Sequence, residues 1–308
     1  MNEHDPFEFD ISDVIDPNST LDPDHWRLLR RLRLPDQFNS PGGGTVKKAL
    51  VIDVEATGLS IQDDDVIQLA MLPFRYEVES GRILDVCKDE AFEGLREPAV
   101  PISEEAAMVT GITHDMLVGQ SIDESLVSRV VTDVDLVIAH NAAFDRPMVE
   151  RVWPCFQEKP WSCTVAEVDW LREGFNAGKL DYLGMQFGWF YDGHRALADC
   201  EACLALLAQT LPASGRQCIT AVREAALKKE YLVRAIDSPY DAKDRLKGRG
   251  YRWRPPELRN GNVWWTVTED SDAEATWLSD EVYNRKVDLP IQPITALTRY
   301  SERLWDFK

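Results

Sequence analysis

Two four-residue apolar runs, each followed at once by polar residues, constrain this chain more than any other feature. Residues 49–52 end directly before Asp53, and residues 136–139 end directly before His140 and Asn141. Short apolar runs of this kind are typical of strands that are buried on both faces of a sheet. The pattern predicts a layered α/β domain in which polar side chains gather where the strands end.

Further strands and helices follow from the same patterns. We expect strands over residues 66–74 and 82–92, and a helix that begins after residue 101 with Ser103 as its cap. Additional helices are expected over residues 143–152, 179–187 and 195–211. Strands that come early and then alternate with helices predict a mixed sheet with helices on both faces.

The chain divides into four segments by charge and composition. Residues 1–25 hold eight acids and no lysine or arginine, and a short basic helix is expected over 25–34, followed by a Gly-rich linker. The predicted boundaries are an arm, helix and linker over 1–45, an α/β domain over 46–212, a connecting helix over 213–235, and a small Arg/Trp-rich α+β module with its tail over 236–308.

Composition limits the classes of protein that fit. With 308 residues the chain can bury a sizeable core, and its net charge of −19 argues against a general nucleic-acid coat protein. The longest apolar runs are far shorter than the roughly 20 residues that a membrane helix needs. With no secretory pattern at the start, we expect a cytoplasmic protein whose six cysteines stay reduced, including the Cys200 and Cys203 pair.

Acidic residues form the candidate site. Asp53 and Glu55 lie two residues apart at the end of the first strand, so both side chains point to one face. Carboxylates this close repel each other unless a cation lies between them, and oxygen ligands suit Mg²⁺ or Mn²⁺. Asp145 follows the 136–139 strand, and Asp199 lies five residues after His194 at the start of a helix.

Each of these residues has a structural alternative when it is taken alone. An aspartate at the end of a strand is commonly a helix cap or a turn former, and a histidine before a helix is commonly a surface residue. The ordered set, with small residues beside each acid, favours a metal-dependent catalytic site. By contrast, residues 63–65 are interpreted as a solvated acidic turn, and His114 with Asp115 as the start of a helix.

Three stretches of the sequence, residues 53–59, 140–145 and 194–199, resemble the three motifs of the DEDDh 3′→5′ exonucleases. Residues 105–113 resemble a helix of the same family that precedes a Gly-Ile-Thr turn, and residues 179–183 resemble the helix before its third motif. This family includes proofreading subunits and ribonuclease T. The resemblance extends over roughly residues 46–212. It implies a ribonuclease H-like fold with a mixed five-stranded sheet, and a phosphodiester hydrolase that uses two Mg²⁺ or Mn²⁺ ions.

The resemblance also implies a role for each site residue. Asp53 would bridge both ions, Glu55 and Asp199 would help hold one ion, and Asp145 would help hold the other, partly through water. His194 would accept the proton of the attacking water. The residues expected to bind the terminal nucleotide are Thr57, Gly58, Leu59, Asn141 and Phe144.

The predicted function is release of nucleoside monophosphates from single-stranded 3′ ends, with DNA favoured as substrate. Two alternatives stay open, namely trimming of RNA 3′ ends and a scaffold that binds nucleic acid without cutting it. We also expect a replication or repair protein as partner, and no membrane. In the C-terminal module, Trp253, Trp264 and Trp265 are expected either to form a small core or to provide a further grip on substrate.

Overall fold

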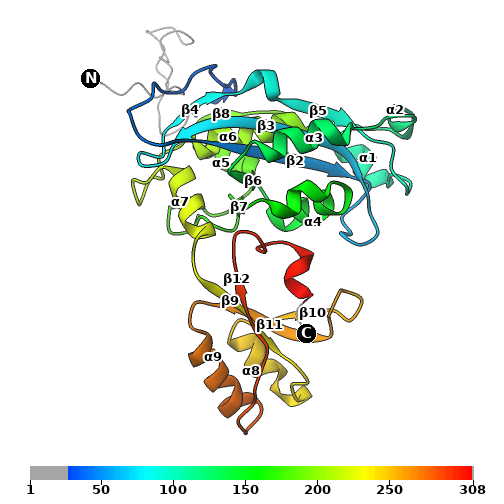
Figure 1. Ribbon diagram of the computed structural model, residues 1–308, viewed down its shortest axis with the longest axis vertical. Helices are drawn as coiled ribbons and strands as arrows, with labels where there is room; N and C mark the ends of the chain where they lie inside the picture. The colour runs from blue at the N-terminus through cyan, green and yellow to red at the C-terminus, as the bar shows by residue number, and fades with distance from the viewer. Residues whose placement is uncertain (1–26, 307–308) are drawn as a thin grey trace.

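The structure is a computed structural model that describes residues 27–306, and it contains two separate main sheets (Figure 1). The larger sheet consists of β2 (Val46–Ala56), β3 (Val66–Glu77), β4 (Ile83–Val86), β5 (Phe92–Leu95), β6 (Leu136–Ala139) and β7 (Trp161–Cys163). Its order is β4-β3-β2-β6-β7, and β5 pairs with β3 beside β4. Because β2 runs antiparallel to β3 and parallel to β6, the expected mixed sheet is confirmed, with five strands in the main order and β5 as a sixth.

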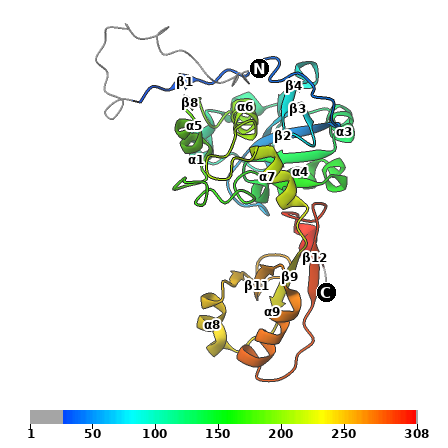
Figure 2. The ribbon, with the colours of Figure 1, turned by 90° about the vertical axis from the view of Figure 1, so that its left-hand side faces the viewer.

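Helices cover both faces of this sheet (Figures 1 and 2). The helices of this part of the chain are α1 (Glu104–Thr110), α2 (His114–Leu117), α3 (Glu124–Thr132), α4 (Ala142–Val152), α5 (Leu180–Gln186), α6 (Ala196–Leu207) and α7 (Cys218–Ala226). Short turns η2 (Lys88–Glu90) and η3 (Pro154–Glu158) complete it. Side chains of α5, α6 and α7 form one core cluster, and those of α3 and α4 form the other.

Strand β2 divides its side chains between these two clusters. Ala49 and Val51 belong to the α6 side, whereas Leu50, Ile52 and Val54 belong to the α4 side. This alternation follows from the two-residue period of a strand. The same period places residues 53 and 55 of β2 on the face that α6 covers.

The prediction of a basic helix over residues 25–34 is wrong for residues 27–34, the part that the structure describes. Residues 27–34 are extended, and β1 (Arg30–Arg31) pairs in parallel with β8 (Trp189–Phe190). The backbone amides of Arg30 and Leu32 donate to Gly188 and Phe190. Leu32 and Leu34 pack against the core while Arg31 and Arg33 are exposed, which is a two-residue period that the sequence already contained.

The strand expected over residues 82–92 is broken into two. β4 and β5 both pair with β3, and the turn η2 lies between them. The expected acidic arm over residues 1–25 and the start of the basic helix lie outside the described residues. Within the described part of the chain, no helix is long and apolar enough to cross a membrane.

The smaller sheet is antiparallel and has the order β10-β11-β9-β12. Its elements are β9 (Glu230–Ala235), η4 (Tyr240–Ala242), α8 (Lys243–Gly248), β10 (Arg252–Arg254), β11 (Val263–Thr268), α9 (Ser271–Trp277), the π-helical turn η5 (Leu278–Val282), β12 (Ile291–Ile294) and η6 (Glu302–Trp305). Residues of α8 and η5 cover one face around Val233, and η6 covers the other around Leu232.

The prediction of one connecting helix over residues 213–235 holds only for residues 218–226. α7 ends at Ala226, and residues 230–235 form β9, which is an inner strand of the smaller sheet. Tyr231, Leu232 and Val233 pair on both sides, with β11 and with β12. The two neighbouring strands take up the hydrogen bonds of this backbone, and that tertiary pairing overrides local helix propensity.

The segment after β12 joins the smaller sheet to the larger domain. Arg146, in α4, is fully buried and donates hydrogen bonds to the carbonyl oxygens of Ala296, Leu297 and Arg299 at 2.6–3.0 Å. Its Nε donates to Glu150 at 2.7 Å. A buried guanidinium with this many partners fixes the C-terminal segment against α4.

Candidate active site

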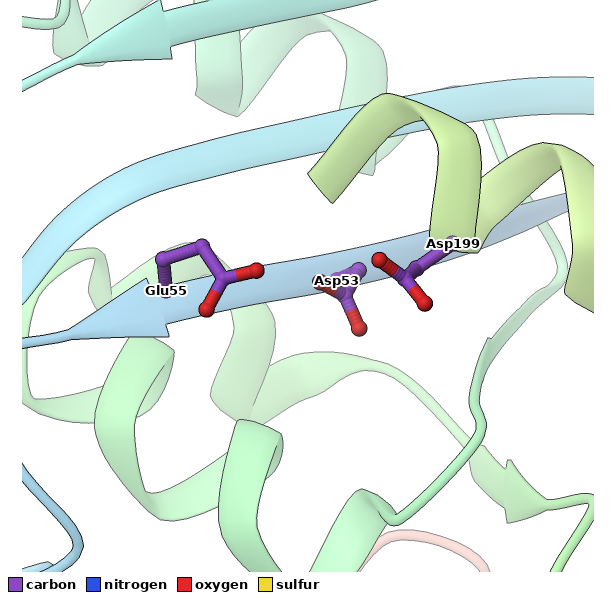
Figure 3. Close-up of side chains that lie close together, drawn as sticks. All are labelled: Asp53, Glu55 and Asp199. Atoms are coloured by element: carbon purple, nitrogen blue, oxygen red, sulfur yellow. The ribbon is translucent and has the colours of Figure 1, made fainter. Parts of the chain in front are cut away.

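Two carboxylates of β2 face helix α6. Asp53 and Glu55 continue the face of Ala49 and Val51, because side chains of a strand alternate between faces. Asp199 reaches the same place from the first turns of α6. Oxygen atoms of Asp53, Glu55 and Asp199 all lie within 4.8 Å of one another, and Figure 3 shows the three side chains gathered beside β2.

Asp199 is held in place by two hydrogen bonds. The hydroxyl of Tyr191 donates to Oδ1 at 2.8 Å, and the backbone amide of Arg195 donates to Oδ2 at 3.0 Å. Arg195 is the residue that precedes α6, so the second bond satisfies a free amide at the helix start. Tyr191 is not among the site residues predicted from the sequence, because a single tyrosine before a helix forms no recognisable pattern with its neighbours.

Asp145 approaches the site from α4. Its side chain is buried, and Oδ1 accepts a long hydrogen bond from the amide of Val54 at 3.3 Å. Val54 lies between the two carboxylate-bearing residues of β2, so this contact ties the α4 acid to the same strand.

The four acids are mutually destabilising when they are ionised without a cation. Burial, followed by the charges of the other acids, raises the pKa of Asp53 well above its ordinary value. Burial and the charge of Asp199 raise the pKa of Glu55 to about 7, and burial raises that of Asp145 to about 8. Burial also raises the pKa of Asp199, although the bond from Tyr191 opposes this. Divalent cations would reverse these shifts.

The two histidines near the motifs differ in exposure. His194 is exposed and has a φ of 61°, directly before the segment that caps α6. His140 is mostly buried, its Nδ1 lies 2.7 Å from Oγ1 of Thr164, and burial lowers its pKa to about 4. An exposed imidazole can exchange protons with water, whereas a buried neutral one cannot easily do so. Of the two histidines, only His194 is open to solvent beside the start of α6.

The loop after β2 is organised by an acidic residue that the sequence interpretation assigned to a solvated turn. The hydroxyl of Thr57 is fully buried, donates to Asp64 at 2.8 Å and accepts from the amide of Asp65 at 2.9 Å. A Cβ on Gly58 would lie 2.5 Å from the Asp64 carboxylate. Only Asp63 fits the expected solvated turn, since it is exposed.

This packing changes how the expected nucleotide-binding residues can act. The side chain of Thr57 is occupied inside the protein, and its backbone amide and carbonyl are bonded to Asp65 and Ser103, so Thr57 shapes the loop from within. Leu59 projects outward with 88% of its surface exposed, as a residue that packs on a base would. Asn141 is exposed at the start of α4, and Phe144 is half-buried beside Asp145.

The cysteines play no part in this site. All six are free thiols, and Cys200 and Cys203 are buried in the core beneath α6. Both belong to α6, and their side chains pack in the core.

The sequence profile of the RNase T exonuclease family matches residues 50–207, just over half of the chain. The chain therefore belongs to the RNase T family of exonucleases, which are phosphodiester hydrolases with a ribonuclease H-like fold. The matched region contains all four acids, which lie in β2, α4 and α6.

Known proteins with similar sequences include DNA polymerases. The chain is 32% identical over 174 residues to DNA polymerase III PolC-type of Bacillus subtilis, a match that covers 53% of this chain. It is 33% identical over 159 residues to that of Listeria innocua, covering 49%. The chain spans about a tenth of the length of these curated relatives, since the matches cover 11% and 10% of them.

A solved structure of exonuclease X in complex with 5′ overhanging duplex DNA is similar at 24% sequence identity with a TM-score of 0.40. The match covers 56% of this chain and 99% of that one.

Proposed function

We propose that this chain is a metal-dependent 3′→5′ exonuclease that releases nucleoside monophosphates from single-stranded 3′ ends. The observation that carries the proposal is the convergence of Asp53, Glu55 and Asp199 within 4.8 Å, with Asp145 buried behind them. Family membership supports the reaction class.

The donor set fits divalent cations of the magnesium class. It is made of oxygen atoms, which Mg²⁺ and Mn²⁺ prefer, and it contains no thiolate or imidazole among its inner members. The raised pKa values of these acids are what an anionic site shows when no cation neutralises it. Asp53, Glu55 and Asp199 would hold the ions, and Asp145, buried beside β2, would support them.

Bound cations would neutralise the phosphodiester and stabilise the attacking and leaving oxygens. The residues of the chain perform the remaining tasks. His194, exposed at the start of the α6 segment, accepts the proton of the attacking water. Tyr191 and the amide of Arg195 fix both oxygens of Asp199, so that the carboxylate keeps one orientation. Leu59 packs against the terminal base, and Asn141 and Phe144 line the approach.

We favour DNA as the substrate because the curated relatives at 32–33% identity are named as DNA polymerases. Discrimination between DNA and RNA depends on how a protein contacts the 2′-hydroxyl. Trimming of RNA 3′ ends is therefore the outcome that the substrate test must separate from cleavage of DNA.

The test is mononucleotide release from 3′-labelled and 5′-labelled DNA and RNA oligomers with Mg²⁺, Mn²⁺ or EDTA. We expect the 3′ label to leave first, as a mononucleotide, only with a divalent ion, and faster from DNA. Asp53→Asn should abolish release, whereas Asp63→Asn, which removes an exposed carboxylate of the neighbouring loop, should retain it.

Two outcomes would overturn the proposal. Equal rates of mononucleotide release by the parent and by Asp53→Asn would show that Asp53 is not part of the catalytic site. Binding of oligomers without metal-dependent release would leave the non-cutting scaffold as the function.

A further inference from the structure

We propose that the C-terminal module carries a second nucleic-acid site, which binds an unpaired stretch of the strand whose 3′ end enters the carboxylate site. The identity of that strand rests on the proposed function. The site is a groove of about 710 Å³ between the η4–α8 segment and the β10–β11 hairpin. We call it the aromatic groove, after Tyr240, Trp253 and Trp264 in its lining; Lys243 and Lys247 also line it.

Strand register explains how two of the three tryptophans reach the groove. Trp253 pairs with Trp264 across β10 and β11, and Trp264 pairs with Ala235 across β11 and β9. Residues opposite each other in a ladder point to the same face. This row therefore presents two indoles and then a small side chain, and all three of its members line the groove.

The third tryptophan points to the other face. Trp265 is the next residue along β11, and its ring packs against that of Trp305 with 5.3 Å between centroids. Arg252 lies over Trp265 at 4.2 Å on the same side. The core alternative holds for Trp265, which packs against the cluster beneath η6. Trp264 packs against the cluster beneath α8 and also lines the groove, whereas Trp253 lines the groove and is partly exposed.

The aromatic rings are available to a ligand. Trp253 keeps 44% of its surface exposed, and Tyr240 keeps 83%. The centroids of Trp253 and Trp264 are 5.4 Å apart, less than the roughly 7 Å that a base inserted between two rings would need. A base would therefore stack on the exposed face of Trp253 instead of entering between the indoles.

Two ammonium groups accompany these rings. Lys243 and Lys247 are one turn apart in α8, with Nζ 4.9 Å from the ring centre of Tyr240 and 5.9 Å from that of Trp264. Among the described residues, Lys243 bonds to the Tyr240 hydroxyl, and neither lysine forms an ion pair with a carboxylate. Asp237 is the acid that lines the groove.

Stacking surfaces beside free cations favour single-stranded nucleic acid over other occupants. Every base offers a π-face to an aromatic ring, and the adjoining phosphates require positive charge. Residues 223–259 hold eleven lysines and arginines against six acids, in a chain whose net charge is −19. The attraction belongs to this stretch, which contains α8 and β10, and not to the whole module, because residues 260–308 hold nine acids against five lysines and arginines.

The test measures binding apart from cutting. The full chain carrying Asp53→Asn is kept in EDTA, and the anisotropy of a labelled oligo-dT of about 16 nucleotides reports binding. Trp253→Ala should weaken binding by about 5- to 100-fold, the range for loss of one stacked base, and Trp253→Phe should restore most of it. Lys243→Glu with Lys247→Glu should flatten the salt dependence, lowering its slope by about 1.4.

Matched controls separate the groove from general effects. Arg285→Glu with Lys286→Glu makes the same charge change as the double lysine variant, in the same module but outside the aromatic groove, and it should bind like the parent. Thermal melting shows whether each variant is folded. Tyr240→Ala offers a second test at an exposed ring, where removal of the side chain threatens the core least.

Failure of this proposal and failure of the exonuclease proposal give different results. If the chain does not cut, the EDTA binding assay still reports whether the groove holds the oligomer. If it cuts, Trp253→Ala should raise the KM for long strands and leave release from a dinucleotide unchanged. If Trp253→Ala and the double lysine variant both bind the oligomer like the parent, the aromatic groove is not a nucleic-acid site. Selective binding of a proline-rich peptide in place of the oligomer would also contradict the proposal.

Discussion

The hydroxyl of Tyr191 lies 2.8 Å from Oδ1 of Asp199 and donates its hydrogen to that carboxylate. Burial, followed by the charge of Asp199, raises the pKa of Tyr191 beyond the physiological range, so the phenol stays a donor. This contact lowers the pKa of Asp199 while burial raises it. Tyr191 is therefore a positioning residue for a candidate metal ligand.

Tyr191→Phe should weaken divalent-ion binding by about 10-fold or more, because outer partners of metal ligands orient them and tune their basicity. Calorimetric titration with Mn²⁺ measures the loss. Tyr231→Phe, which removes a hydroxyl from the smaller sheet, is the matched control and should bind Mn²⁺ like the parent. Unchanged Mn²⁺ affinity in Tyr191→Phe would show that the phenol only packs.

The metal-free protein should lose stability as pH rises. The pKa values of Glu55 and Asp145 are about 7 and about 8 in the folded chain, against ordinary values of 4.5 and 3.8. The folded state therefore binds these protons more tightly, and the free energy of unfolding falls between about pH 4 and pH 8.

Thermal melting in EDTA across this pH range measures that loss, and Mg²⁺ should remove most of it by favouring the ionised carboxylates. Asp145→Asn should raise the melting temperature in EDTA at pH 8 and reduce the gain from Mg²⁺. A melting temperature in EDTA that rises from pH 5 to pH 8 would contradict the raised pKa values.

His194→Asn should lower kcat by about 10²- to 10⁴-fold, the usual contribution of a general base. Asparagine is the suitable replacement because His194 has a φ of 61°, and asparagine adopts this left-handed region readily. Mn²⁺ affinity should be nearly unchanged, which separates proton transfer from metal binding. Activity within a few-fold of the parent would assign the proton transfer elsewhere.

Asp64→Ala should raise the KM for oligonucleotides more than it lowers kcat. The carboxylate accepts bonds from the Thr57 hydroxyl and from the amide of Ser60, so its removal loosens the loop that presents Leu59. Loss of these bonds should also lower stability by about 1–3 kcal/mol. Asp63→Ala is the control in the same loop, and steady-state kinetics with thermal melting distinguish the two variants.

Arg146→Met should detach the C-terminal segment from α4. It leaves the Glu150 carboxylate buried with Arg303 and Ser301 as its remaining partners, and it removes the side-chain bonds to three carbonyl oxygens. Ala296 keeps the amide of Trp161 and Leu297 keeps Arg303 as donors. Breaking a buried ion pair from one side costs about 3–5 kcal/mol. Limited proteolysis should cut near Leu297 sooner, whereas Arg172→Met, at an exposed arginine, should show no change.

The sequence by itself determined those helices and strands whose start, end or buried face depends on residues within one short segment. The run before Asp53 predicts a buried strand, and the two-residue period places Glu55 on the face of Asp53, where the structure has it. Ser103 predicts the start of α1, and its hydroxyl does accept from Ala106. These features depend on residues within one or two turns of each other.

Tertiary structure decided what depends on distant partners. Residues 230–235 form a strand because β11 and β12 take its hydrogen bonds, and residues 30–31 are extended because β8 lies beside them. Tyr191 acquires its role only when the fold brings it to Asp199. The opposite faces of Trp264 and Trp265 follow from the register of β11 with its neighbours, since a strand's period is local but the surface that each face meets is not.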